Sequence, residues 1–241
     1  AASDLNQVLA NLRPMLPASD ARVLAANSYL GLIESYLGQS ERAEQRLLEV
    51  SQLEATQADY PLGQRLATAR YRARVLRWQD RVPEAQAILG EAESWMQHPG
   101  ATVSTLARSR FQVELALTQL AAGQLQTSTR NLELAERALA DPSTSTLDQA
   151  QLLMARARLA LTQADAASAA QYAQSALGLL RAQLEETHWD IGEARGLLAL
   201  AQWQQRRGRD EREALLSALE WHEAQRPWHP DTIVLRKLVK R

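Results

Sequence analysis

Apolar residues recur along the chain at the spacing of amphipathic helices, and the helices recur in pairs. Each pair has a small residue in the middle of its first helix, a short turn, and a small residue in its second helix. The first set of small residues is Gly31, Ala73, Ala116, Ala157 and Ala201, with spacings of 42, 43, 41 and 44. The second set is Ala43, Ala85, Ser128, Ala169 and Ala214, with spacings of 42, 43, 41 and 45. Two independent markers with one period predict stacked helix-turn-helix repeats.

The register of these markers divides the chain into five full repeats and two partial ones. We expect full repeats at about residues 20–58, 62–98, 102–141, 146–185 and 188–226, and partial repeats at 3–13 and 230–241. All of them, residues 1–241, are expected to form one right-handed α-solenoid domain. The small residues are expected where two helices cross, because Gly or Ala lets the backbones approach closely.

Composition favours an all-α protein. Apolar residues make up 46% of the chain and aromatic residues only 5%, with a single phenylalanine, so helix-forming residues dominate. The formal charge of −1 gives no global positive field, so no nucleic-acid partner is expected. The absence of cysteine excludes disulfides, thiol catalysis and cysteine-based metal sites.

The sequence also lacks the usual signals for a membrane span and for most catalytic centres. It contains no run of about 18 apolar residues, so a membrane contact is expected only through flanking sequence. The start has neither an initiator Met nor a signal-peptide pattern, and we interpret the chain as a piece of a longer protein. No metal-binding motif, phosphate-binding glycine loop or GxSxG elbow is present, so we expect no cofactor, no metal and no catalysis.

The paired helices, with Leu-Gly or Leu-Ala, a turn glycine and then Ala, resemble the tetratricopeptide (TPR) repeat. The period near 42 is similar to the longer variety found in kinesin light chains and in many bacterial signalling proteins. The resemblance covers nearly the whole sequence and implies a non-catalytic module that binds a protein or peptide partner.

The segment from His188 to Thr232 is more specific. Its "HWD", "EAR" and "HPDT" stretches resemble the terminal repeats of bacterial eukaryotic-like serine/threonine kinases. That resemblance implies a periplasmic sensor region anchored to the membrane by sequence outside this chain. The kinase's own Gly-rich loop, His-Arg-Asp and Asp-Phe-Gly motifs are absent from this chain.

Arginines gather on the first helices of the repeats, most densely in Ala69–Trp78, "ARYRARVLRW". At about 100° per residue, Arg70, Arg74 and Arg77 share one stripe, while Arg65 and Arg72 point to the opposite side. In TPR proteins the first helices line the concave groove. The candidate groove residues are Arg70, Arg74, Arg77, Trp78, Arg110, Arg158, Arg195 and Arg206.

Two interpretations of these arginines stay open. Arginine binds carboxylate or phosphate in bidentate fashion, so the groove is expected to bind an acidic peptide, the free carboxyl terminus of a polypeptide or an anionic small ligand. Alternatively, the arginines pair inside the array with Glu34, Asp80, Glu114 or Glu193. The rival functions are a cytoplasmic regulatory segment of a transcription activator and a scaffold or adaptor; a homodimer is also left open.

Overall fold

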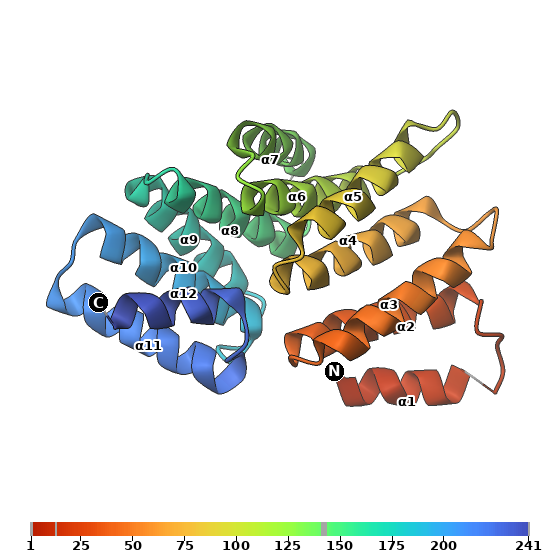
Figure 1. Ribbon diagram of the computed structural model, residues 1–241, viewed down its shortest axis with the longest axis horizontal. Coiled ribbons are helices and arrows are strands. Elements are labelled where there is room, and N and C mark those ends of the chain that lie inside the picture. The colour runs from red at the N-terminus through yellow and green to blue at the C-terminus, as the bar shows by residue number, and fades with distance from the viewer. Residues whose placement is uncertain (1, 13, 141–143, 241) are drawn as a thin grey trace. The chain divides into compact units, whose positions relative to one another are not determined.

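The computed structural model describes residues 2–12, 14–140 and 144–240, and the regular structure of these residues is entirely α-helical (Figure 1). The helices are α1 (Ala2–Leu12), α2 (Ala21–Tyr36), α3 (Ser40–Ala55), α4 (Leu62–Trp78), α5 (Val82–Gln97), α6 (Thr105–Ala121), α7 (Leu125–Leu139), α8 (Thr146–Thr162), α9 (Ala166–Arg181), α10 (Trp189–Gln205), α11 (Arg209–Gln225) and α12 (Pro230–Val239). None of these helices combines the length and the apolar character that a membrane span requires.

The helices form two compact units. Unit 1 is Ala1–Gly123, with α1 to α6, and unit 2 is Gln124–Arg241, with α7 to α12. The boundary lies inside the third expected repeat, between α6 and α7. Whether residues 1–241 act as one domain therefore stays a prediction, and each unit is described by itself.

The turn between paired helices repeats along the chain with the period of the sequence. One residue in each of four turns has a positive φ: Gly38 (76°), Asp80 (63°), Gly123 (74°) and Ala164 (60°). Glycine adopts this left-handed conformation without cost, whereas alanine does not. The turn geometry is therefore set by the repeat and is kept even where the residue is unfavourable.

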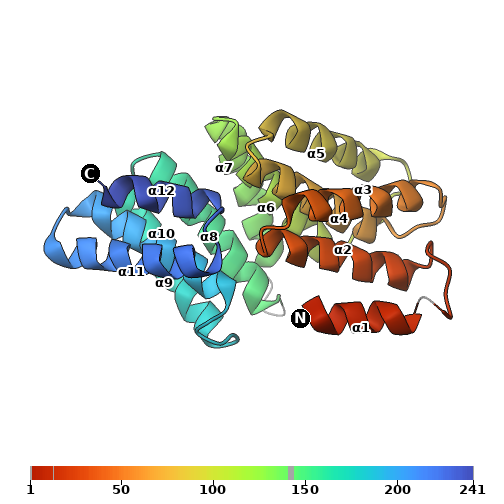
Figure 2. The ribbon, with the colours of Figure 1, turned by 60° about the horizontal axis from the view of Figure 1, so that its bottom comes forward.

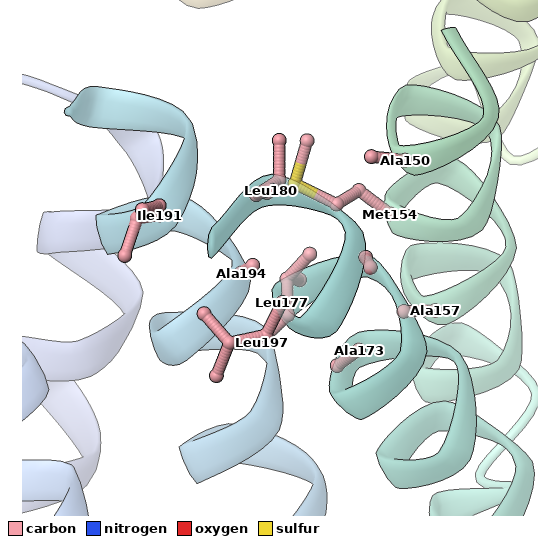
Figure 3. Close-up of a cluster of buried hydrophobic side chains, with 10 residues drawn as sticks. Ala150, Met154, Ala157, Ala173, Leu177, Leu180, Ile191, Ala194 and Leu197 are labelled. Atoms are coloured by element: carbon pink, nitrogen blue, oxygen red, sulfur yellow. The ribbon is translucent and has the colours of Figure 1, made fainter. Parts of the chain in front are cut away.

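Small residues allow the close packing of paired helices that the sequence predicts. A Cβ at Gly31 in α2 would lie 2.7 Å from Leu47 Cγ in α3. In unit 2, Ala150, Met154 and Ala157 of α8 pack against α9 and α10 in one buried cluster (Figure 3). Its other buried members are Ala173, Ala176, Leu177, Leu180, Ile191, Ala194 and Leu197.

In α10 the close-packing position differs from the expected one by two residues. Ala201 is buried with Ala160 and Ala169, of α8 and α9. Ala199 is instead in the cluster that joins α10 to α11 and α12. Ala199, 42 residues after Ala157, is therefore the fifth small residue that faces its own second helix. The expected register failed here because Ala199 and Ala201 are both small and only packing distinguishes them.

Gly192 marks the tightest contact between α10 and α11. A Cβ at this position would lie 2.1 Å from the Trp221 ring, whereas a Cβ at Gly178 in α9 would meet nothing within 4 Å. We expect Gly192→Ala to lower the free energy of unfolding by about 1–3 kcal/mol through overpacking. Gly178→Ala should raise it by about 1 kcal/mol, because alanine is the better helix former. Urea unfolding of both variants checks this, and equal effects would contradict it.

Candidate functional site

The candidate site in unit 1 lies on α2, α4 and α6, where α4 packs against both α2 and α6 (Figure 2). We call the side of these helices that faces away from α3 and α5 the first-helix face. Arg65 and Arg72 of α4 line a groove together with α3 and α5. Arg70 and Arg74 point the other way, because each is two residues from Arg72 and residues two apart on a helix are separated by about 200°. Arg77 is on their side, since it binds the same Glu114 as Arg74. The expected arginine stripe is therefore on the first-helix face.

Arg74 and Arg77 both bind Glu114 of α6. Arg74 donates from Nε and Nη2 to Oε2 at 2.9 and 2.7 Å, and Arg77 donates from Nη2 to Oε1 at 2.7 Å. The side chain of Glu114 is fully buried. Burial alone would raise the pKa of Glu114, but the two guanidinium groups outweigh it and lower the pKa to about 2. The paired interpretation of the arginines therefore applies to these two residues.

Arg70 differs from its neighbours. Among the described residues no carboxylate lies within ion-pair distance of Arg70, and its buried Nε has no acceptor. Its guanidinium lies over the ring of Tyr71, 5.6 Å from the centroid. Burial is the main reason that the pKa of Arg70 is lowered; the charges of Arg74 and Arg110 lower it further, whereas Tyr71 and Glu114 act in the opposite direction. Arg70 is thus a desolvated cation without an ion-pair partner among the described residues.

Aromatic side chains of α2 contact those of α4 in this unit. Tyr29 of α2 is 51% exposed, and its ring centroid lies 5.8 Å from that of Tyr71. Trp78 packs edge to face on Tyr36 at 5.0 Å, and the Tyr36 hydroxyl accepts a hydrogen bond from Arg74 Nη1. The first-helix face therefore combines an exposed aromatic ring with a cation, which are the residue types enriched at protein interfaces.

In unit 2, Arg158 is part of a buried charge network. It donates to Asp231 of α12 at 2.8 and 2.5 Å and to Glu193 of α10 at 2.8 Å. Burial would raise the pKa of Glu193, but Arg158 and Arg226 outweigh it and lower the pKa to about 2. Arg158 Nη2 thus joins α8 to α10 and α12. Glu193 is one of the acidic residues with which the arginines were expected to pair in the alternative interpretation.

Two histidines of unit 2 begin helices. His188 Nδ1 accepts from Asp190 N, and His229 Nδ1 accepts from Asp231 N, each at 3.2 Å. The "HWD" and "HPD" stretches of the sequence are therefore N-terminal caps of α10 and α12. No group of three His, Asp or Glu residues in the described part of the chain could hold a metal ion.

The last two expected residues, Arg195 and Arg206, belong to unit 2. Arg195 pairs with Glu186 and lines a groove of about 530 Å³ between α9, α10 and α11. Arg206, 81% exposed, follows α10 and is 3.9 Å from Glu211. The expected position of Arg195 was counted from Ala201, so the two-residue register shift explains its place.

The structure thus brings together five of the eight candidate residues. Arg70, Arg74, Arg77 and Trp78 of α4 and Arg110 of α6 lie in unit 1, where Arg110 is near enough to lower the pKa of Arg70. Arg158, Arg195 and Arg206 belong to unit 2. Sequence reasoning did not identify Tyr29, whose one signal was an aromatic residue in the first helix of a repeat. As ligand contacts, all eight residues stay predictions.

Comparison with known proteins identifies the fold. No protein-family model matches the chain. No curated protein sequence matches it. Among solved structures, it is similar to the nearly identical TPR-like repeats of a Podosopora anserina kinesin light chain, with 21% identity over 87% of this chain and 98% of that chain and a TM-score of 0.54. It is also similar to BtubC (BKLC) from P. vanneervenii, with 13% identity over 95% of this chain and 91% of that chain and a TM-score of 0.61.

These similarities confirm that the chain has a TPR-like, all-α solenoid fold, as the repeat period predicted. At identities of 21% and 13% they carry the fold alone. They do not test the resemblance of His188–Thr232 to kinase sensor regions, which stays a prediction.

Proposed function

We propose that this chain is a non-catalytic protein-interaction module that binds an acidic peptide segment of a partner on the first-helix face of unit 1. The fold supports the general role, because stacked helical repeats present extended surfaces to binding partners. The observation that carries the acidic specificity is Arg70, the cation on this face that no described carboxylate pairs with.

The charge arrangement explains why Arg70, rather than the whole stripe, is the proposed contact. Glu114 already binds both Arg74 and Arg77 at 2.7 Å, so these two arginines brace α4 against α6. Arg70 is left with a ring beneath it and no acceptor for its buried Nε. A partner carboxylate would pair with the Nη nitrogens of this guanidinium, and Tyr29 would contribute an exposed aromatic surface beside it.

Reversal of the charge at Arg70 should strongly weaken binding of the acidic peptide. The test uses a peptide array with acidic, neutral and basic versions of the same apolar sequences, and the tightest acidic peptide is then measured by fluorescence anisotropy. Arg70→Glu is expected to weaken its binding by more than about tenfold, because an attractive contact becomes a repulsive one. The affinity of the acidic peptide for the unchanged protein should also fall as the salt concentration rises.

The matched control is Arg72→Glu, on the same helix but on the opposite side. It should leave the affinity for the acidic peptide within about twofold, since Arg72 is on the opposite side of α4 and makes no contact with the proposed peptide surface. If Arg72→Glu abolishes binding and Arg70→Glu does not, the binding surface is on the other side of α4. If basic or neutral peptides bind as tightly as acidic ones, the acidic specificity is wrong.

The wider context is a further part of the proposal. We propose that the module is the extracytoplasmic, periplasmic sensor region of a membrane-anchored serine/threonine kinase; the support is the resemblance carried by His188–Thr232. The alternative is a cytoplasmic regulatory segment of a transcription activator. A kinase domain and a membrane helix in the same polypeptide would support the first, and an adjacent DNA-binding domain would support the second.

A further inference from the structure

A second groove lies on the opposite side of α4 from the first-helix face. It has a volume of about 350 Å³ and runs between α3 and α5, with α4 as its floor. We call it the α3–α5 groove. Its volume is at the small end of the range for ligand pockets, which is about 300–1,000 Å³. It therefore suits a small molecule better than an extended peptide.

Arg72 is the cation on the floor of this groove. Its Nη1 donates to Ser51 Oγ at 3.1 Å, and among the described residues it makes no other hydrogen bond and no ion pair. Burial lowers the pKa of Arg72, while Glu91, Glu44 and Glu54 act weakly in the other direction. Arg72 is thus partly desolvated, fixed at one nitrogen by Ser51, and has Nε and Nη2 open to a ligand.

Arg65, the other cation of the groove, is used by the fold. Its Nη2 donates to the main-chain carbonyls of Glu54 and Gln57, at the C-terminal end of α3. Arg65 therefore caps a helix. It adds positive charge to the groove, but its guanidinium is already used by the main chain and is not available for a bidentate contact. This leaves Arg72 as the residue that can bind a planar anion in bidentate fashion.

The wall of the groove formed by α5 has two apolar residues and one acidic residue. Ile88 and Trp95 lie seven residues apart on α5, so they share one face of that helix, and both line the groove. Glu91, exposed on the same helix, also lines it. A second anionic group on a ligand would meet Glu91, so the charges favour a ligand with a single carboxylate.

We propose that the α3–α5 groove binds a small organic monocarboxylate, with its carboxylate on Arg72 and its apolar body between Ile88 and Trp95. This inference is independent of the proposed peptide surface, because the two sites use opposite sides of α4.

Glu54 makes the groove sensitive to pH. It is 3% exposed, lines the groove and accepts from Thr68 Oγ1 at 2.8 Å. Burial raises the pKa of Glu54 to about 7; the groups that face it and oppose this are Thr68, Tyr60, Arg65 and Arg72. As the pH rises through 7, Glu54 gains a negative charge and repels a bound carboxylate.

The test uses phenylacetate as the probe and phenylacetamide as its uncharged match. We expect phenylacetate to shift the indole N–H signal of Trp95 saturably in NMR titrations of the protein of residues 1–241, with the signal assigned from Trp95→Phe. Arg72→Gln should weaken binding at least about tenfold, the value of a charge-assisted hydrogen bond. Phenylacetamide should bind at least about tenfold more weakly than phenylacetate, for the same reason.

Two further variants keep the test decisive. Arg70→Gln, on the other side of α4, should leave phenylacetate binding unchanged. Arg72→Lys retains the charge but loses the fork, so its affinity should fall between those of Arg72→Gln and the unchanged protein; it replaces Arg72→Gln if that variant does not fold. Absence of a saturable shift, equal affinity for the amide, or unchanged binding by the Arg72 variants would overturn the proposal.

The pH dependence provides a separate arm. Phenylacetate binding should weaken between about pH 6 and pH 8, where the probe itself stays ionised and Glu54 titrates. Glu54→Gln should remove this dependence while leaving binding at the acidic end intact. A dependence that persists in Glu54→Gln would show that another group controls the groove.

Discussion

Replacing Glu114 by glutamine should lower the free energy of unfolding by about 3–5 kcal/mol, because it leaves two desolvated guanidinium groups without a counter-charge. The side chains of Arg74 and Arg77 are each 14% exposed, and that of Glu114 is completely buried. Glutamine keeps the shape of the side chain but can accept at one oxygen only. Chemical denaturation, followed by the fluorescence of Trp78 and Trp95, measures the loss.

Two comparisons separate the charge effect from a general loss of packing. Glu93→Gln, at an exposed position of α5, should change stability by no more than about 0.5 kcal/mol. Replacing the three charged residues together, by Glu114→Leu, Arg74→Met and Arg77→Met, should restore much of the loss, since buried ion pairs are often neutral against apolar groups of similar volume. A loss below about 1 kcal/mol for Glu114→Gln would mean that the two arginines find water or other acceptors.

Acidification should destabilise unit 2 through His229. This residue is 1% exposed, and burial lowers its pKa to about 3 even though Asp231 and Glu193 favour its protonation. Between about pH 3 and pH 6.5 the unfolded chain binds the proton and the folded chain does not, so stability rises with pH in that range. The contribution is fully present above the unfolded pKa and is lost as the pH falls.

The expected loss is about 2 kcal/mol between pH 7 and pH 5, at about 1.4 kcal/mol per unit below the unfolded pKa. His229→Asn should remove this part of the slope, because asparagine also caps helices but does not titrate; burial also lowers the pKa values of His188 and His222, and their contribution stays in both proteins. His98→Asn, at the exposed end of α5, should leave the slope unchanged. Denaturation curves over this pH range provide the measurement; a slope in His229→Asn equal to that of the unchanged protein would contradict the assignment.

Glu54 in unit 1 affects the pH dependence of stability in the opposite direction from His229. Its pKa is raised from 4.5 to about 7, so the folded state holds the proton that the unfolded chain releases. Its contribution to stability is therefore present below the unfolded pKa and is lost as the pH rises to 7. The His229 experiment is for this reason read from the difference between the variant and the unchanged protein, in which the effect of Glu54 cancels.

The helical architecture could be predicted from the sequence because two sets of small residues kept one period. The same periodicity placed Arg70, Arg74 and Arg77 on one side of α4 and Arg65 and Arg72 on the other, since the geometry of a single helix is enough for this. These statements depend on spacing along one element, and spacing is directly readable.

Contacts between elements were harder to predict. Glu114 was one of four acidic residues named as alternatives, and only the packing of α6 on α4 selects it for Arg74 and Arg77. The place of Arg195 was missed because Ala199 and Ala201 are equally small. The capping of α10 by His188 was also missed, since Ser, Thr, Asp and Asn are the usual caps and histidine carries no comparable signal.

The α3–α5 groove was missed for a related reason. Glu54 and Arg72 belong to different repeats, and their proximity depends on how α3 and α5 diverge over α4. A sequence pattern that follows one helix at a time does not show such a space. Arg72, one of the two arginines expected on the opposite side of α4 from the first-helix face, is therefore the residue whose guanidinium is available to a ligand in this groove.

The central claim, that a partner segment lies on the first-helix face beside Arg70, is tested most directly by site-specific photo-crosslinking with the acidic peptide selected on the array. A photoreactive phenylalanine analogue replaces either Tyr29 of α2 or Leu48 of α3, which are 51% and 40% exposed. Tyr29 is in ring contact with Tyr71, beneath Arg70, whereas Leu48 lines the α3–α5 groove. We expect the peptide to be captured at position 29, and the Arg70→Glu substitution to abolish that capture. Capture at position 48 in place of 29, or capture at 29 that survives Arg70→Glu, would contradict the account.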